Sequence, residues 1–335
     1  MPNTGFAPIL CVAAGHLPAR CVKVVLLSGR PDRTRSTWTA SLAWRWAVAT
    51  WLVALTACSC GGPQRPPERW TVFYGVEAPP ELLHGHDIVV LDPGYRGDLG
   101  AVRSKGAKVL AYLSLGELNR QRETFGAAER AGVLVRENPN WPGAFVVDLR
   151  HPAWTAIAVQ EMALPLQARG FDGLFLDTLD SALALEREAP DNYRGMRQAA
   201  VALVTHLRAR WPDSVLMVNG ALELTGELRE VTAAFAIEST FTTWDFQAKQ
   251  ARLLRPDERA ASLKRQQAAR AANLALRLYT LDYWDVEDRA GVRAIYAAQR
   301  QAGFVPYVAT IALDRVVPEP AQPSAEDAPQ AAAPP

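Results

Sequence analysis

Cysteine is almost missing from the greater part of this sequence. The four cysteines, Cys11, Cys21, Cys58 and Cys60, all lie within the first sixty residues of a chain of 335. The residues that follow can therefore form neither a disulfide framework nor a thiolate metal site. Redox catalysis by cysteine is excluded for the folded part of the chain.

An excess of charge of one sign is also missing. The formal net charge of the whole chain is +1, and the residues after position 57 carry 30 of the 36 basic and 34 of the 35 acidic residues, a net charge of −4. This balance gives no electrostatic basis for binding nucleic acid or an anionic membrane surface. We expect no nucleic-acid partner, and no feature of the sequence predicts a protein partner.

The common motifs of metal, nucleotide and serine chemistry are absent as well. The sequence has no H-x-x-H or H-E-x-x-H zinc pattern, no Walker loop and no G-x-S-x-G elbow. The histidines after residue 57 do not end any strand assigned to the main sheet, and they are His84, His86, His151 and His206. We expect no metal ion and no cofactor, which leaves carboxylates, tyrosines and an amide for any chemistry.

The N-terminal region has the pattern of a targeting segment. Basic residues precede the apolar run "WRWAVATWLVALTACSC", which ends in small residues and cysteine. The run is too short to span a membrane comfortably, and "LTAC" resembles a bacterial lipobox with Cys58 as the lipidated residue. An ordinary secretory signal cleaved near Ala57 and a short buried helix are the alternatives. Lipidation predicts a protein anchored in the bacterial cell envelope, at the outer membrane, with the lipid as its sole membrane contact. Secretion is the alternative location.

Composition divides the chain into four parts. We predict a lipoprotein signal peptide at residues 1–57, with a start that is long for a leader, and a flexible Gly/Pro/Arg linker at residues 58–69. A folded domain is expected at residues 70–317 and a disordered Pro/Ala-rich tail at residues 318–335. A domain of about 250 residues has the typical size of a (β/α)8 barrel.

Short apolar runs alternate with Ala/Leu/Arg segments through this domain, which is typical of parallel strands joined by helices. Eight such runs predict strands, the number that closes a TIM barrel, at Trp70–Gly75, Asp87–Pro93, Lys108–Glu117, Asp172–Asp177, Val215–Gly220, Ala233–Ser239, Leu276–Tyr283 and Phe304–Thr310. A ninth run, Ala144–Arg150, is expected to be an accessory strand. A doubly wound sheet is the rival architecture, but "YGVEAPP" after the first strand is not a glycine-rich phosphate turn.

Two helices have clear sequence signals. The segment from His151 to Gly170 begins with a proline and ends at a glycine, as helix termini favour. The segment from Met196 to Asp213 places Ala200, Leu203, Val204 and Leu207 on one stripe. We interpret both apolar faces as core packing.

Polar residues collect at the carboxyl ends of the predicted strands. In a barrel these ends form the mouth where chemistry takes place, although a single carboxylate at such a position often caps the next helix. The set comprises Asp92, Tyr112, Glu117, Asp177, Asp180, Asn219, Glu238, Asp282, Tyr283 and Thr310. So many polar strand ends favour one common site.

Carboxylates without a metal suit glycoside hydrolysis, in which one carboxylate is the nucleophile and a second is the acid and base. Aromatic side chains near the rim could stack on sugar faces, and the candidates are Trp141, Trp244 and Trp284. Each of these is equally well explained as a core residue.

The strand-end motifs resemble those of glycoside hydrolase family 114. The segments "FYGVE", "VVLDP", "VLAYLSLGE", "GFDGLFLDTLDS", "MVNG", "IEST", "LDYWD" and "YVAT" match in order and spacing over about residues 70–317. This is the endo-α-1,4-polygalactosaminidase group, which is related to the hydrolase domain of the bacterial Pel polysaccharide protein. The resemblance implies a TIM barrel and a retaining, metal-free mechanism on α-linked galactosamine or N-acetylgalactosamine polymers.

The resemblance also implies roles for residues. Asp177 matches the nucleophile and Glu238 the acid/base, and Asp180 is expected to hold a loop or raise a neighbour's pKa. The remaining residues are expected to line the cleft or contact sugar hydroxyls, and they are Tyr74, Asp92, Tyr112, Glu117, Asn219, Asp282 and Tyr283. Two other functions stay open at this point: a carbohydrate-binding envelope lipoprotein that has lost turnover, and a hydrolase of a different α-glycan.

Overall fold

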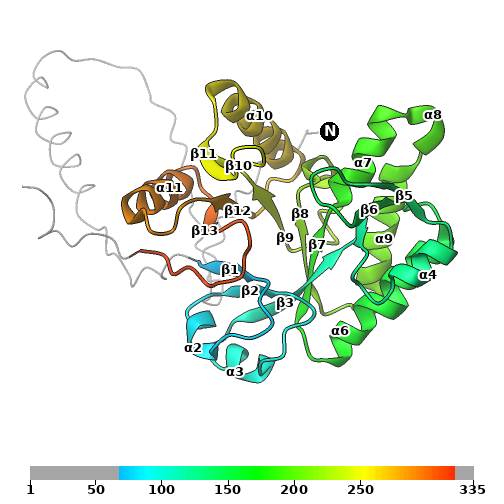
Figure 1. Ribbon diagram of the computed structural model, residues 1–335, viewed down its shortest axis with the longest axis horizontal. Coiled ribbons are helices and arrows are strands. Elements are labelled where there is room, and N and C mark those ends of the chain that lie inside the picture. Colours follow the sequence, from blue (N-terminus) through cyan, green and yellow to red (C-terminus); the bar gives the residue numbers. More distant parts are fainter. Residues whose placement is uncertain (1–67, 321–335) are drawn as a thin grey trace, which may run out of the picture. The chain divides into compact units, whose positions relative to one another are not determined.

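The strands predicted from the sequence form one parallel sheet in the computed structural model, which describes residues 68–320 (Figure 1). The predicted signal peptide, Cys58, most of the linker and residues 321–335 lie outside the described residues. The sheet has the order β1-β2-β3-β7-β8-β9-β12-β13, and its strands are β1 (Trp70–Phe73), β2 (Ile88–Leu91), β3 (Lys108–Ser114), β7 (Gly173–Asp177), β8 (Val215–Asn219), β9 (Ala234–Glu238), β12 (Leu278–Tyr283) and β13 (Val305–Ala309). All eight predicted barrel strands are confirmed.

The first and last strands come together and close the sheet into a (β/α)8 barrel. The Tyr74 N–H, just after β1, donates to the Leu313 carbonyl beyond β13 at 2.7 Å. Inside the barrel, the ring of Trp70 on β1 lies 6.2 Å from the ring of Tyr307 on β13. The TIM-barrel prediction is therefore confirmed.

Helices follow most of the strands. They are α2 (Pro80–Leu83), α3 (Leu99–Arg103), α4 (Phe125–Arg130), α5 (Pro152–Ala156), the π-helix η1 (Ile157–Ala163), α6 (Leu164–Ala168), α7 (Leu179–Glu188), α8 (Pro190–Tyr193), α9 (Met196–Arg210), the 3₁₀ turn η2 (Leu222–Leu224), α10 (Pro256–Ala272) and α11 (Arg289–Gln301). The predicted stripe on α9 is buried, as expected. None of the helices in residues 68–320 is long and apolar enough to cross a membrane.

Two excursions leave the barrel at the carboxyl ends of its strands. After β3, a three-stranded sheet of order β4-β6-β5 is formed by β4 (Glu117–Asn119), β5 (Leu134–Glu137) and β6 (Ala144–Val147). After β9, the hairpin of β10 (Thr242–Asp245) and β11 (Gln250–Leu253) leads into α10. Strand β6 confirms the accessory strand, whereas β3 ends at Ser114 and not at Glu117 as predicted.

The side chains of each strand alternate in direction, and this alternation separates two hydrophobic cores. Every second side chain of a strand points into the barrel. Inside it, one buried cluster includes Trp70, Val90, Leu110, Phe175 and Met217. The intervening side chains pack against the helical layer in a second cluster. This alternation decides which polar residue at each strand end faces the mouth.

Candidate active site

Polar side chains from neighbouring strands meet at the carboxyl end of the barrel interior. Continuing the inward alternation of each strand places Tyr74, Asp92, Tyr112, Asp177, Asn219, Glu238 and Tyr283 on the interior side of strands β1, β2, β3, β7, β8, β9 and β12. Seven of the predicted site residues thus lie at the carboxyl end of the barrel interior.

Two carboxylates are joined by one amide at the centre of this group. Asn219 Nδ2 donates to Asp177 Oδ1 at 2.8 Å and to Glu238 Oε1 at 2.7 Å, so these two carboxylate oxygens are at most 5.5 Å apart. Asn219 is buried at the end of β8, between the strands that carry the two acids. The amide therefore fixes the position of one carboxylate relative to the other.

Tyrosines hold the other oxygen of each carboxylate. The Tyr112 hydroxyl donates to Asp177 Oδ2 at 2.9 Å, and the Tyr283 hydroxyl donates to Glu238 Oε2 at 2.6 Å. The ring of Tyr74 packs edge-on against the ring of Tyr112. Burial is the main cause that raises the pKa of all three tyrosines well above the ordinary value, so their hydroxyls stay protonated as donors.

Burial is the main cause that raises the pKa of both acids, and a neighbouring charge raises the pKa of Glu238 further. Burial raises the pKa of Asp177, and the hydrogen bonds from Asn219 and Tyr112 oppose that shift. Burial and then the charge of Asp177 raise the pKa of Glu238 to about 7. Part of the Glu238 side chain is exposed to solvent, although many protein atoms surround its carboxyl group. A carboxyl that holds a proton near neutrality, as Glu238 can, is suited to the role of an acid.

The backbone after Asp177 is held in an unusual conformation. Thr178 has a left-handed φ of 65°, which is rare for a β-branched residue. Its hydroxyl accepts hydrogen bonds from the N–H groups of Gly116 and Glu117 and lies 2.7 Å from Ser114 Oγ. These contacts tie the end of β7 to the end of β3 and so fix the direction of Asp177.

Asp92 and Asp180 stand at the edge of this group. Asp92 forms an ion pair with Arg122 at 2.8 Å and accepts a hydrogen bond from the Gly94 N–H. Asp180 lies against Gly220 and remains open to solvent, and burial with the charge of Asp177 raises its pKa to about 6. Asp180 is in turn one of the charges that raise the pKa of Glu238, as predicted for a neighbour of the pair.

The prediction that Asp282 contacts a sugar hydroxyl is wrong. Its neighbours Leu281 and Tyr283 point into the barrel, so Asp282 points outward and is fully buried against α11. Its carboxylate accepts hydrogen bonds from the backbone N–H groups of Thr240, Phe241 and Thr242. The sequence contained this signal, because two adjacent residues of one strand cannot both face the interior.

Glu117 also differs from its predicted position. It lies on β4, outside the barrel sheet, and is only 5% exposed. Its Oε1 accepts hydrogen bonds from Asn138 Nδ2 at 2.8 Å and from Ser181 Oγ at 2.6 Å. The expected role of Glu117 in lining the cleft is therefore corrected to one of anchoring the β5–β6 loop.

Sequence reasoning missed Arg122 and Thr178. Arg122 lies in an irregular segment between β4 and α4, where no periodic pattern marks it. Thr178 follows Asp177 directly, but only the structure shows its left-handed backbone.

Of the three tryptophans predicted near the rim, Trp284 packs beside α11 and donates to Asp288, apart from Asp177 and Glu238. Within residues 68–320, no cluster of His, Cys, Asp and Glu side chains is arranged to hold a metal ion.

Comparison with known proteins relates this chain to glycoside hydrolases. The model of glycoside-hydrolase family GH114 matches residues 53–324. The glycoside hydrolase domain of PelA from Pseudomonas aeruginosa is 31% identical with a TM-score of 0.68, over 75% of this chain and 97% of that domain. An uncharacterized protein of Deinococcus radiodurans is 30% identical over 247 residues, which are 69% of this chain and 75% of the relative.

A more distant structure shares the fold. Ega3 from Aspergillus fumigatus, solved in complex with galactosamine, is 14% identical with a TM-score of 0.51, over 74% of this chain and 92% of that one. At this identity the likeness concerns the barrel alone.

Proposed function

The chain belongs to glycoside hydrolase family GH114 and is a glycosidase, and from this membership we propose that it cleaves α-1,4-linked galactosamine or N-acetylgalactosamine polysaccharide with retention of configuration. Asp177 is the proposed nucleophile and Glu238 the proposed acid/base. The substrate and the roles of the two acids are the proposal.

The proposed reaction has two steps. Protonated Glu238 gives its proton to the glycosidic oxygen while ionised Asp177 attacks the anomeric carbon, so the glycosidic bond breaks and a glycosyl ester forms. Glu238, now ionised, takes a proton from water, and the oxygen of that water attacks the same carbon and releases Asp177. Glu238 ends the cycle protonated, and no other reactant is required.

The spacing of the carboxylates is the observation that carries this proposal. The two oxygens that share the Asn219 amide are at most 5.5 Å apart, given donor distances of 2.8 and 2.7 Å. Retaining enzymes keep their carboxyl groups about 5–5.5 Å apart, whereas inverting enzymes need about 6.5–9.5 Å to admit a water molecule. The raised pKa of Glu238, about 7, supports the same assignment, since the acid must hold its proton near neutrality.

Charge at the mouth supports an amino sugar as the substrate. Asp177, Asp180 and Glu238 lie together, and the charge of Asp177 raises the pKa of each of the other two. Such a cluster would attract the ammonium group of unacetylated galactosamine. Galactosamine is also the sugar in the Ega3 structure, and it is therefore the first to test.

The experiment incubates the full chain with partially deacetylated galactosaminogalactan and detects oligosaccharides by mass spectrometry. Asp177→Asn should lower the rate on the order of 10⁴-fold or more, and Glu238→Gln about 10²- to 10⁴-fold. The matched control is Asp191→Asn, because the Asp191 side chain is 97% exposed. Release by Asp177→Asn at the wild-type rate would refute the assignment, and release from another α-glycan alone would change the proposed substrate.

Lipid anchoring in the cell envelope is a separate proposal. It rests on the basic flank, the apolar run and the sequence "LTAC" around Cys58. Mass spectrometry of the mature chain from the membrane fraction tests it. A diacylglyceryl group on Cys58 is the expected result, and a mature N-terminus elsewhere would contradict it.

A further inference from the structure

Two exposed aromatic side chains from different excursions meet. Trp141, in the β5–β6 loop, is 50% exposed, and Phe246, at the tip of the β10–β11 hairpin, is 46% exposed. Their ring centroids are 5.5 Å apart and the ring planes are nearly perpendicular, at 87°. The pair therefore forms a corner with apolar faces open to solvent.

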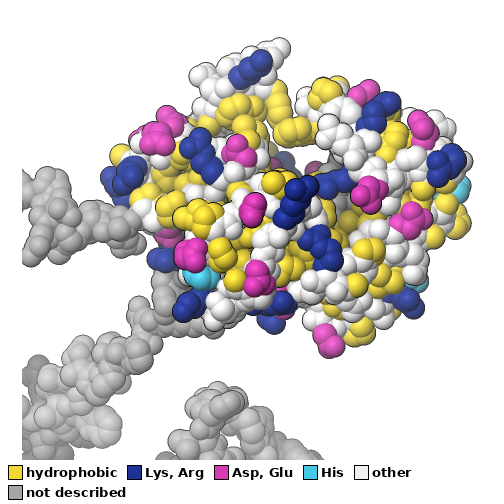
Figure 2. Space-filling model, turned by 60° about the horizontal axis from the view of Figure 1, so that its bottom comes forward, with side chains coloured by type: hydrophobic (Ala, Val, Ile, Leu, Met, Phe, Trp, Pro, Cys, Tyr) yellow, Lys and Arg dark blue, Asp and Glu magenta, His cyan; other side chains and the backbone are white. Residues whose placement is uncertain are grey.

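The order of the barrel strands relates this corner to the carboxylates. The two excursions start at the carboxyl ends of β3 and β9, and β7 and β8 lie between these strands in the sheet. Asp177 ends β7 and Asn219 ends β8. A contact between the two excursions therefore reaches across the strand ends that carry the site. Figure 2 shows hydrophobic side chains beside a hollow near the top of that view.

A third aromatic residue connects the corner with the interior of the barrel. Trp244 lies on β10, two residues before Phe246, and is partly buried. It packs against the same interior cluster as Tyr112, and that cluster includes Tyr283. These two tyrosines are the ones that donate to Asp177 and Glu238. Trp244 thus adds a third aromatic ring, packed against the interior cluster, to the hairpin that carries Phe246.

The β5–β6 loop, which carries Trp141, is anchored near Asp177. The Trp141 N–H donates to the Asn138 carbonyl, and Asn138 Nδ2 donates to the buried carboxylate of Glu117. The same carboxylate oxygen accepts from Ser181, four residues after Asp177. The buried carboxylate of Glu117 therefore ties the β5–β6 loop to the start of α7, shortly after Asp177.

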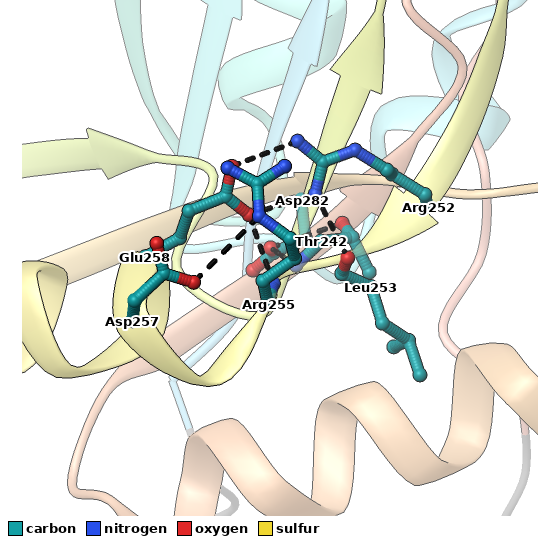
Figure 3. A network of polar contacts seen from close by, with 7 residues as sticks. All are labelled: Thr242, Arg252, Leu253, Arg255, Asp257, Glu258 and Asp282. Carbon is teal, nitrogen blue, oxygen red and sulfur yellow. Dashed lines mark hydrogen bonds and ion pairs between the residues drawn. The ribbon is translucent and has the colours of Figure 1, made fainter.

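The hairpin that carries Phe246 is anchored at two points (Figure 3). At its base, buried Asp282 accepts from the N–H of Thr242 at 2.7 Å. On β11, Arg252 donates to both carboxylate oxygens of Glu258 in α10, at 2.7 and 2.9 Å. These bonds hold the hairpin in one position, so Phe246 is presented without ordering the backbone on binding.

We propose that Trp244, Phe246 and Trp141 form a stacking track for hexosamine rings of the polymer, on one side of the scissile bond. This inference rests on the proposed function and adds a chain-length requirement to it. Exposed aromatic surface beside a catalytic cleft is a frequent mark of a ligand site. The apolar C–H face of a pyranose is complementary to an aromatic face, and the exposed pair can offer such a face to a sugar ring of the polymer.

The test measures kcat and KM of the full chain on galactosamine oligomers of increasing length. Trp141→Ala and Phe246→Ala should each raise KM for long oligomers about threefold to tenfold, with less effect on kcat. The effect should shrink as the oligomer shortens, and Trp141→Phe should recover most of the affinity. Leu274→Ala is the control, because Leu274 is 95% exposed and belongs to neither excursion.

Binding without turnover separates this inference from the proposed function. Calorimetry with Asp177→Asn, with and without Trp141→Ala, should show weaker binding of long oligomers in the double variant. Equal affinities and a KM independent of Trp141 at every length would overturn the track, even if the wild type cleaves the polymer. A wild type that binds and cleaves no galactosamine oligomer would instead refute the proposed function.

Discussion

At the scale of single residues, the candidate site depends on the hydrogen bonds and neighbouring charges of two carboxyl groups, Asp177 and Glu238. Asp177 accepts hydrogen bonds from Asn219 and Tyr112 that favour its ionised form. Glu238 has Asp177 as a neighbouring charge, which favours its protonated form. The proposed mechanism assigns the ionised form to Asp177 and the protonated form to Glu238, whose pKa is raised to about 7.

The pH dependence of activity should follow from this division. We predict a bell-shaped profile whose alkaline limb lies near pH 7, because Glu238 must be protonated for the first step and its pKa is raised to about 7. Asp180→Asn removes a negative charge that raises this pKa, so the limb should move to lower pH. Steady-state kcat/KM between pH 4 and 10 measures both effects. Asp191→Asn, at a 97% exposed side chain, should leave the limb in place.

Tyr283→Phe should move the same limb in the opposite direction. The Tyr283 hydroxyl donates to Glu238 Oε2 at 2.6 Å and stabilises the ionised form. Its loss raises the pKa of Glu238, so the alkaline limb should shift to higher pH while kcat/KM falls roughly tenfold. A limb that stays in place or moves to lower pH would contradict the assignment of Glu238 as the titrating acid.

At the scale of elements, alternation along a strand determines which predictions succeed. The eight barrel strands could be predicted because short β-branched runs buried on both faces have a clear pattern. Along β12, however, Tyr283 faces the mouth and Asp282 the helices, and treating both as sugar contacts ignored the period of two. The same period, counted from Leu281, could have made this distinction from the sequence.

Other elements carried too little pattern to be predicted. Strands β5 and β11 have no buried residue, so their sequences lack an apolar alternation. The helix predicted from His151 to Gly170 contains a π segment at Ile157–Ala163, just before Pro165. Proline has no N–H for the normal helical bond, which accounts for a widened turn at this place. No composition rule predicts this local adjustment.

Asp282 provides a prediction at this scale. Asp282→Ala leaves the N–H groups of Thr240, Phe241 and Thr242 without their acceptor and should lower the free energy of unfolding by about 3–5 kcal/mol. Asp282→Asn keeps one acceptor oxygen, and its new N–H group can pair with the unpartnered Gln299 Oε1 once the Gln299 amide, whose Nε2 donates to Asp282, turns over. Its cost should be about 1–2 kcal/mol. Urea denaturation checks both values, and equal costs would contradict the anchoring role.

At the scale of the whole molecule, charges of both signs are mixed over the face in Figure 2, without a large patch of one sign. The acidic cluster of Asp177, Asp180 and Glu238 is therefore a local feature of the barrel mouth. Holding three carboxyl groups with raised pKa values close together destabilises their ionised forms. Such a cluster lowers the free energy of unfolding of the protein, while it supplies the groups needed for catalysis.

This cost should appear in the dependence of stability on pH. Because the pKa of Glu238 is raised from its ordinary value of 4.5 to about 7, the folded state binds more protons than the unfolded state between these values. The contribution of Glu238 to stability is therefore lost as the pH rises from 4.5 through 7. Glu238→Gln should have a higher Tm than the wild type at pH 8 and a smaller difference at pH 4. Thermal unfolding curves whose difference does not change with pH would contradict the raised pKa.

The stereochemistry of the first product tests the central claim most directly. The full chain is mixed with an α-linked galactosamine oligomer, and the anomeric protons of the new reducing end are followed by NMR before mutarotation. Retention through Asp177 and Glu238 predicts that the α anomer appears first. If the β anomer appears first, the enzyme inverts, and the two carboxylates joined by Asn219 are not the nucleophile and acid/base pair.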